Sequence, residues 1–215
     1  MAPDRPRGTI GIVFATLGIA ACLLTGCSPN APAGPALGNG SAETRAAMHK
    51  VIFDKDLINL MGYEDAASII EDSREGTEDH YEDIVEGDDG SVEVTYTTAQ
   101  LEKQRRWCED GIEDSLSAYR DDTDGGRLEV SNDRRTVSVR ITKEAAFSRS
   151  GLWTFSSARS LEVYCAQLQI LGHPGDPFWD VTLEIIDSKS GKPVRSASLR
   201  EGGIQDVSPE EWPSA

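Results

Sequence analysis

The residues of this 215-residue chain best suited to specific chemistry are four cysteines and three histidines. Thiolates and imidazoles bind transition metals, but a structural zinc site needs four such ligands together. The histidines His49, His80 and His173 lie far apart in the sequence, and no pair has the spacing of a metal-binding motif. No GxSxG, HExxH, P-loop or Rossmann motif is present either. The sequence therefore predicts no catalytic residue, no resident metal and no cofactor.

The N-terminal residues have the pattern of a secretory signal. Arg5 and Arg7 precede an uncharged apolar run, Thr9 to Leu24, which is shorter than the about 20 residues that a membrane-spanning helix needs. A basic start, a short apolar run and small residues before a break are typical of a cleaved signal peptide. We therefore expect the mature chain to work outside the cytoplasm.

The break itself, Leu24-Thr25-Gly26-Cys27, resembles the lipobox of bacterial prolipoproteins. The resemblance implies a diacylglyceryl group on the Cys27 thiol, removal of residues 1–26, and a location on the outer face of the bacterial cytoplasmic membrane. Two acyl chains anchor a protein stably where one chain does so only marginally. Residues 27–41, rich in Pro, Gly and Ala, would then form a flexible tether. The alternatives are an ordinary signal peptide with an unmodified Cys27, or an uncleaved anchor.

Cys108 and Cys165 are the two cysteines left for pairing, because Cys22 lies in the signal peptide and Cys27 is expected to carry the lipid. An even pair in an oxidising compartment forms a disulfide by default. Such a bond would stabilise the fold by roughly 4 kcal/mol in the chain-entropy view. The alternative is a reactive cysteine, which needs a nearby cation or helix N-terminus to lower its pKa.

The charge of the chain is strongly negative and unevenly distributed. It has 37 acidic and 21 basic residues, for a formal net charge of −16, which argues against a partner made of nucleic acid. Twelve carboxylates and one base, Arg74, fall between Glu64 and Asp89. This stretch could be a solvated helix face, a surface for a cationic partner, or a Ca²⁺ site. Asp88, Asp89 and Glu93 are only weak metal candidates, because they lack the spacing of an EF-hand loop.

The hydropathy pattern predicts that residues 42–90 are helical. Apolar residues at helical spacing favour a helix over residues 42–61, with Ser41 as its cap and Gly62 at its end. One or two short acidic helices follow, with Tyr81, Ile84 and Val85 on the buried side of the second.

Residues 91–200 are predicted to form an α+β domain. A strand over residues 91–97 precedes a helix capped by Thr97 and Gln100. Hairpins over 128–141 and 181–199 flank a second helix over 156–171, and residues 201–215 form an irregular tail. We expect one antiparallel sheet of about four to five strands, with two helices packed on one face.

The strand VEVTYT and the amphipathic helix after it resemble uncharacterised lipoproteins of Gram-positive bacteria, which imply no activity. The sequence thus favours a lipid-anchored, non-enzymatic binding module of the cell envelope. Its partner could be a cationic peptide, an envelope protein or a small ligand. The alternative is a carboxylate- or metal-dependent envelope hydrolase, for which His173, Asp176 and Asp180 are a weak candidate cluster.

Overall fold

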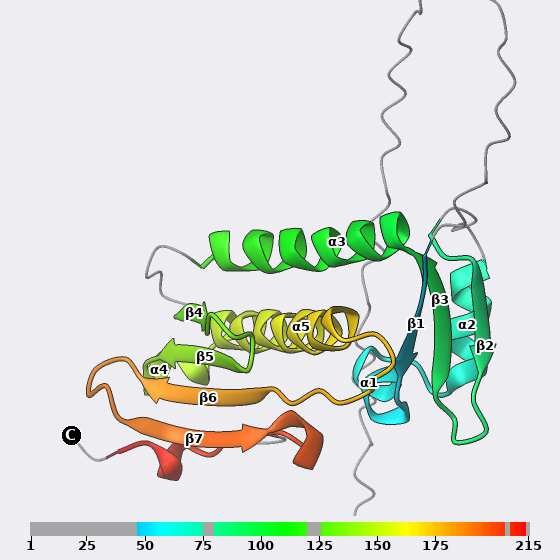
Figure 1. Ribbon diagram of the computed structural model, residues 1–215. Helices are drawn as coiled ribbons and strands as arrows, with labels where there is room; N and C mark the ends of the chain where they lie inside the picture. The colour runs from blue at the N-terminus through cyan, green and yellow to red at the C-terminus, as the bar shows by residue number, and fades with distance from the viewer. Residues whose placement is uncertain (1–46, 75–79, 120–125, 205–206, 214–215) are drawn as a thin grey trace, which may run out of the picture. The chain divides into compact units, whose positions relative to one another are not determined.

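The computed structural model of this protein describes residues 47–74, 80–119, 126–204 and 207–213. The chain divides into two units, Met1–Glu43 and Thr44–Ala215, and all described residues belong to the second. The signal peptide, Cys27 and the tether lie outside the described residues. The second unit is α+β, as the sequence predicts, and contains two separate sheets (Figure 1).

The first sheet is antiparallel with the strand order β1-β3-β2. Its strands are β1 (Met48–Phe53), β2 (Asp83–Glu86) and β3 (Val92–Thr97). Two short helices, α1 (Lys55–Leu60) and α2 (Ala66–Arg74), connect β1 to β2 along the chain.

The helix predicted over residues 42–61 is wrong in its described part. Residues 48–53 form the strand β1, in which Val51 and Phe53 are buried opposite Val94 and Val92 of β3. This run holds β-branched and aromatic residues, which pack well on a pleated sheet, and tertiary pairing overrides the helical spacing. Asp54 then ends the strand and caps α1, where its carboxylate accepts a hydrogen bond from the Leu57 amide.

The acidic stretch is only partly helical. Its first part forms α2, with Ala66, Ile69 and Ile70 buried, but its second part forms β2 instead of a helix. In β2 the buried Ile84 alternates with the exposed Val85, because neighbouring residues of a strand point to opposite faces.

The strand β3 and the helix after it confirm the prediction. Helix α3 (Thr98–Ser117) begins with a capping box in which Thr97 and Gln100 bond reciprocally. Leu101, Cys108 and Ile112 are its buried residues.

Both predicted hairpins are present, but they form a second sheet of order β4-β5-β6-β7. Its strands are β4 (Arg127–Val130), β5 (Thr136–Ile141), β6 (Thr182–Asp187) and β7 (Pro193–Ser198). The sheet is mixed, because β5 and β6 pair in parallel. The prediction of a single antiparallel sheet is therefore wrong in detail.

The parallel pairing follows from the long connection between the two hairpins. A parallel pair needs a crossover, which is usually a helix. Here α4 (Lys143–Ala146) and α5 (Arg149–Gly172) carry the chain back to the starting end of β5. The tail contains two short 3-10 helices, η1 (Leu199–Glu201) and η2 (Pro209–Glu211).

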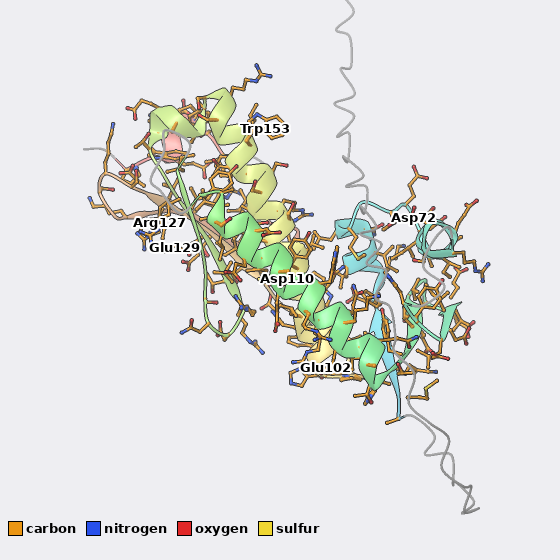
Figure 2. All side chains as sticks on the ribbon, turned by 90° about the horizontal axis from the view of Figure 1, so that it is seen from above. Asp72, Glu102, Asp110, Arg127, Glu129 and Trp153 are labelled. Carbon is orange, nitrogen blue, oxygen red and sulfur yellow. The ribbon has the colours of Figure 1, made fainter. Side chains whose placement is uncertain are left out.

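Helices α3 and α5 pack side by side, and α5 also covers β4, β5 and β6 (Figure 1). The helices approach closely where the Tyr164 ring lies over Gly111, and a Cβ added at Gly111 would be 2.6 Å from that ring. Tyr164 also meets Trp107 edge to face, with ring centroids 5.3 Å apart. Glu102 and Asp110 lie along the other, solvent-facing side of α3 (Figure 2).

A cluster of polar side chains ties the β1–α1 junction to the second sheet. The Asp54 carboxylate accepts hydrogen bonds from Trp179 Nε1 at 3.1 Å and from Arg200 Nη2 at 3.1 Å. The Arg200 guanidinium also lies 5.3 Å from the Phe178 ring centroid, within cation–π range. Because Trp179 is buried, its indole N–H needs this acceptor, so the contact joins the start of α1 to the segments that flank β6 and β7.

Candidate functional site

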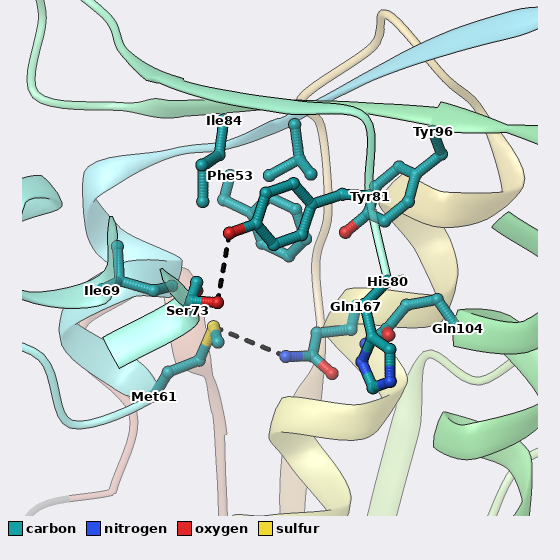
Figure 3. Close-up of a pocket in the computed structure, with 11 residues that line it drawn as sticks. Phe53, Met61, Ile69, Ser73, His80, Tyr81, Ile84, Tyr96, Gln104 and Gln167 are labelled. Carbon is teal, nitrogen blue, oxygen red and sulfur yellow. Dashed lines mark hydrogen bonds between the residues drawn. The ribbon is translucent and has the colours of Figure 1, made fainter. Parts of the chain in front are cut away.

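A pocket of about 170 Å³ lies between the first sheet and helices α2, α3 and α5 (Figure 3). Residues far apart in the chain form its wall: Phe53, Met61, Ile69, Ser73, His80, Tyr81, Ile84, Val94, Tyr96, Gln104 and Gln167. The space is large enough for several waters or one small organic molecule. Small-molecule sites are typically concave, mostly apolar and equipped with a few polar groups.

The apolar side of the pocket is part of the folded core. Phe53, Ile84 and Val94 come from the three strands of the first sheet, and Ile69 faces them from α2. All four residues are buried. The core therefore fixes the shape of this wall before any ligand arrives.

The polar side of the pocket comes from the helices and from the start of β2. The Tyr81 hydroxyl donates to the Ser73 carbonyl at 3.1 Å, and Gln167 Nε2 lies 3.4 Å from the Met61 sulfur (Figure 3). Gln167 is held from its other end, because Cys108 Sγ donates to Gln167 Oε1 at 3.2 Å. This chain of contacts fixes the Gln167 amide at the wall.

Tyr96 adds a phenol to the same pocket. Burial raises the pKa of this phenol well above its ordinary value, with smaller contributions from Cys108 and Tyr81. The group therefore stays protonated at neutral pH. A protonated phenol can donate one hydrogen bond and accept another, which suits a ligand hydroxyl, carbonyl or ether.

Among the described residues that line the pocket there is no Asp, Glu, Lys or Arg, although charged residues make up 27% of the chain, and His80 is the only imidazole. A carboxylate or ammonium ligand would exchange part of its hydration for a largely apolar wall, which disfavours a charged ligand. The described part of this wall contains no carboxylate, and its one imidazole is that of His80. The described lining is therefore suited to binding an uncharged, partly apolar molecule.

The disulfide predicted between Cys108 and Cys165 is wrong for this structure, in which both thiols are free and buried. Cys108 turns instead to Gln167, with which it forms the hydrogen bond described above. Burial raises the pKa of each thiol to about 12, so both remain protonated and weakly nucleophilic at neutral pH. These residues act as core side chains, and Cys108 also supports the pocket through Gln167.

The weak metal candidates do not come together. Asp88 and Asp89 lie in the β2–β3 turn, where Asp89 accepts from the Ser91 amide at 3.0 Å. Glu93 lies on β3 and pairs with Lys50 at 2.6 Å. Within the described residues, no group of three or more His, Cys, Asp or Glu side chains could hold a metal ion.

The weak acid–base cluster is also dispersed. Asp176 accepts a hydrogen bond from the Phe178 amide, Asp180 accepts one from the Ser198 hydroxyl, and His173 Nδ1 contacts the Gln169 carbonyl. Each group therefore has a separate local partner, and the three residues share no site.

The sequence did not identify the pocket. Its only local signal is the alternation that places Val94 and Tyr96 on one face of β3. Tertiary packing brings the other polar residues of the wall to this face, namely Tyr81, Gln104 and Gln167. No sequence motif predicts that packing.

Comparisons with protein-family models, with curated proteins and with solved structures each found no match to this chain. No helix in residues 47–74, 80–119, 126–204 or 207–213 is long and apolar enough to cross a membrane.

Proposed function

We propose that this protein is a lipid-anchored, extracytoplasmic binding module of a bacterial cell envelope, and that it is not an enzyme. The anchor is a diacylglyceryl group on Cys27, and residues 27–41 tether the folded unit to the outer face of the cytoplasmic membrane. The lipobox Leu24-Thr25-Gly26-Cys27 supports this location.

The module binds a small, uncharged, partly apolar ligand in the pocket between the first sheet and helices α2, α3 and α5. The observation that carries this proposal is a pocket in a strongly acidic protein whose described lining contains no Asp, Glu, Lys or Arg. The apolar wall takes the hydrocarbon part of the ligand, and Tyr96, Gln104 or Gln167 bonds its polar atom.

A charge-matched series of ligands tests this proposal. Benzyl alcohol, benzoate and benzylammonium have one ring and nearly one size, and differ mainly in charge. In calorimetric titrations of the purified full chain, we expect benzyl alcohol to bind with a Kd on the order of 1 mM. The two ions should bind at least tenfold more weakly, because the pocket offers no counter-charge.

A pocket-filling variant is the control for this series. Ile69→Phe places a larger side chain against the pocket and should abolish benzyl alcohol binding while the far-UV circular dichroism stays unchanged. Equal affinity for the three ligands, or unchanged binding by the folded Ile69→Phe variant, would show that this pocket is not the site.

A further inference from the structure

Strand β2 is an edge of the first sheet, and no other described strand pairs with its outer side. The Gly87 amide donates to the Ser91 carbonyl at 2.8 Å, and the register places Val85 opposite Glu93. Hydrogen-bonded pairs alternate in an antiparallel ladder, so the amides of Ile84 and Glu86 point away from β3. The Ile84 amide donates to the carboxylate of its neighbour, Asp83, at 3.0 Å, a local bond that an added strand would replace.

This edge opens onto a broad groove of about 690 Å³ between β2 and α2. Its floor is apolar, and its rim carries Glu71 and Glu86 with one cation, Arg74. The residues that line the groove are Ala67, Ile70, Glu71, Arg74, Ile84, Val85 and Glu86. Val85 is 44% exposed, so the strand edge presents an apolar side chain to solvent beside the groove.

The other sheet has an edge that is better protected. Strand β7 begins with Pro193, which cannot donate to an added strand. Arg195 of β7 also pairs with Glu211 of η2 at 3.2 Å. Strand β2 has neither a proline nor a lysine; β4, the other edge of the second sheet, shares this property, so the acidic groove beside β2 is what distinguishes β2.

The negative charge around β2 favours a positively charged partner segment. Among the described residues between Glu64 and Asp89, nine carboxylates face one formal cation, Arg74. A second copy of this edge would bring like charges together and be repelled, as would any acidic segment. A strand that carries lysine or arginine would instead be attracted.

We propose that β2 is a docking edge for an extended cationic peptide segment of another protein, which adds to the first sheet as a further strand. The peptide backbone bonds the outward amide and carbonyl groups of Ile84 and Glu86. One apolar side chain enters the groove between Ile70 and Ile84, and basic side chains on either side reach Glu71 and Glu86. Main-chain bonds supply affinity in this mode, and alternate side chains supply specificity.

Three synthetic peptides test this proposal against the full chain by fluorescence anisotropy at two salt concentrations. The first is a decapeptide of alternating lysine and valine. The second has glutamate in place of lysine. The third is the lysine peptide with alternate backbone amides N-methylated, which keeps its charge and side chains but removes backbone donors. We expect the lysine peptide alone to bind, and more weakly at high salt.

Matched variants locate the binding site. The double variant Glu71→Gln/Glu86→Gln should weaken binding of the lysine peptide about three- to tenfold, since each exposed charge pair contributes modestly. Glu113→Gln, the same change on the exposed side of α3, should leave it unaltered. Glu86→Pro removes one outward amide and should also weaken binding.

Three results would overturn the proposal. If the N-methylated peptide binds as tightly as the lysine peptide, backbone hydrogen bonds do not contribute and only charge attracts the peptide. Equal loss in Glu113→Gln and in the groove variants would place the peptide elsewhere. Binding of the glutamate peptide as tight as that of the lysine peptide would remove the charge selection.

Discussion

Glu162 is a carboxyl group buried on α5, with only 2% of the residue exposed. Its Oε1 has no hydrogen-bond partner among the residues that the structure describes, and its Oε2 lies 3.5 Å from Arg159 Nη1. Burial raises the pKa of this carboxyl from 4.5 to about 7, although Arg159 opposes the shift. An ionised carboxylate at this position is therefore costly, and the folded state holds a proton that the unfolded state releases.

The pH dependence follows from this difference in proton binding. Below pH 4.5 the group is protonated in both states and has no effect on the free energy of unfolding. Between pH 4.5 and about 7 only the unfolded state ionises, so stability falls as the pH rises. Above pH 7 the free energy of unfolding is lowered by the full amount, on the order of 3 kcal/mol.

We expect Glu162→Gln to remove this loss. Urea titrations at pH 4.5 should give similar free energies of unfolding for the variant and the natural chain. At pH 8 the variant should be more stable by about 2–3 kcal/mol, because an amide cannot ionise. A stability difference that does not change between these pH values would contradict the assignment, and Glu113→Gln serves as the exposed control.

At the scale of elements, the junction between α4 and α5 depends on a glycine. A Cβ added at Gly151 would lie 2.3 Å from the Ala145 carbonyl oxygen and 2.6 Å from that of Ala146. Both atoms belong to the backbone and cannot move aside without disturbing α4. By contrast, nothing lies within 4 Å of a Cβ added at Gly172, at the other end of the same helix.

Gly151→Ala should therefore destabilise the protein by about 1–3 kcal/mol, as expected for overpacking. Gly172→Ala should be neutral or stabilising by up to about 1 kcal/mol, because alanine favours the helical state. Thermal unfolding of the two variants gives the comparison. Equal unfolding temperatures for the two variants would contradict the close packing of α5 against α4 at Gly151.

The elements that the sequence predicted well are those fixed by local chemistry. Thr97 and Gln100 form a capping box within one turn, and the two hairpins are joined by short turns. The strand β1 was missed because Val51, Ile52 and Ile58 also fit a helical stripe, and only pairing with β3 decides between the two. The parallel pairing of β5 with β6 depends on a crossover through α5, which local patterns do not reveal.

At the scale of the whole molecule, the candidate pocket was beyond prediction for the same reason. Its wall combines β1, α2, β2, β3, α3 and α5 with Met61, so it exists only after these parts have packed. The disulfide was predicted because paired cysteines in an oxidising compartment usually bond to each other. In the structure both thiols are free, and Cys108 forms a hydrogen bond to Gln167 instead.

Anchoring is also a property of the whole molecule. Cells fed a fatty acid with a clickable tag should label the natural chain at Cys27. Cys27→Ala should remove the label, since the proposed anchor is attached to this thiol. Cys22→Ala, the same change inside the apolar run, should keep it. Label retained by Cys27→Ala would refute the lipid anchor without affecting the pocket.

The central claim is that the uncharged pocket binds a small neutral ligand, and methyl-detected NMR of the full chain titrated with benzyl alcohol tests it most directly. We predict saturable shifts at the methyl groups of Ile69, Ile84 and Val94, which line the pocket, and no saturable shift at the exposed Leu152. Benzoate at the same concentrations should leave all four unchanged. Shifts confined to Leu152, or shifts that never saturate at the pocket methyl groups, would contradict the claim.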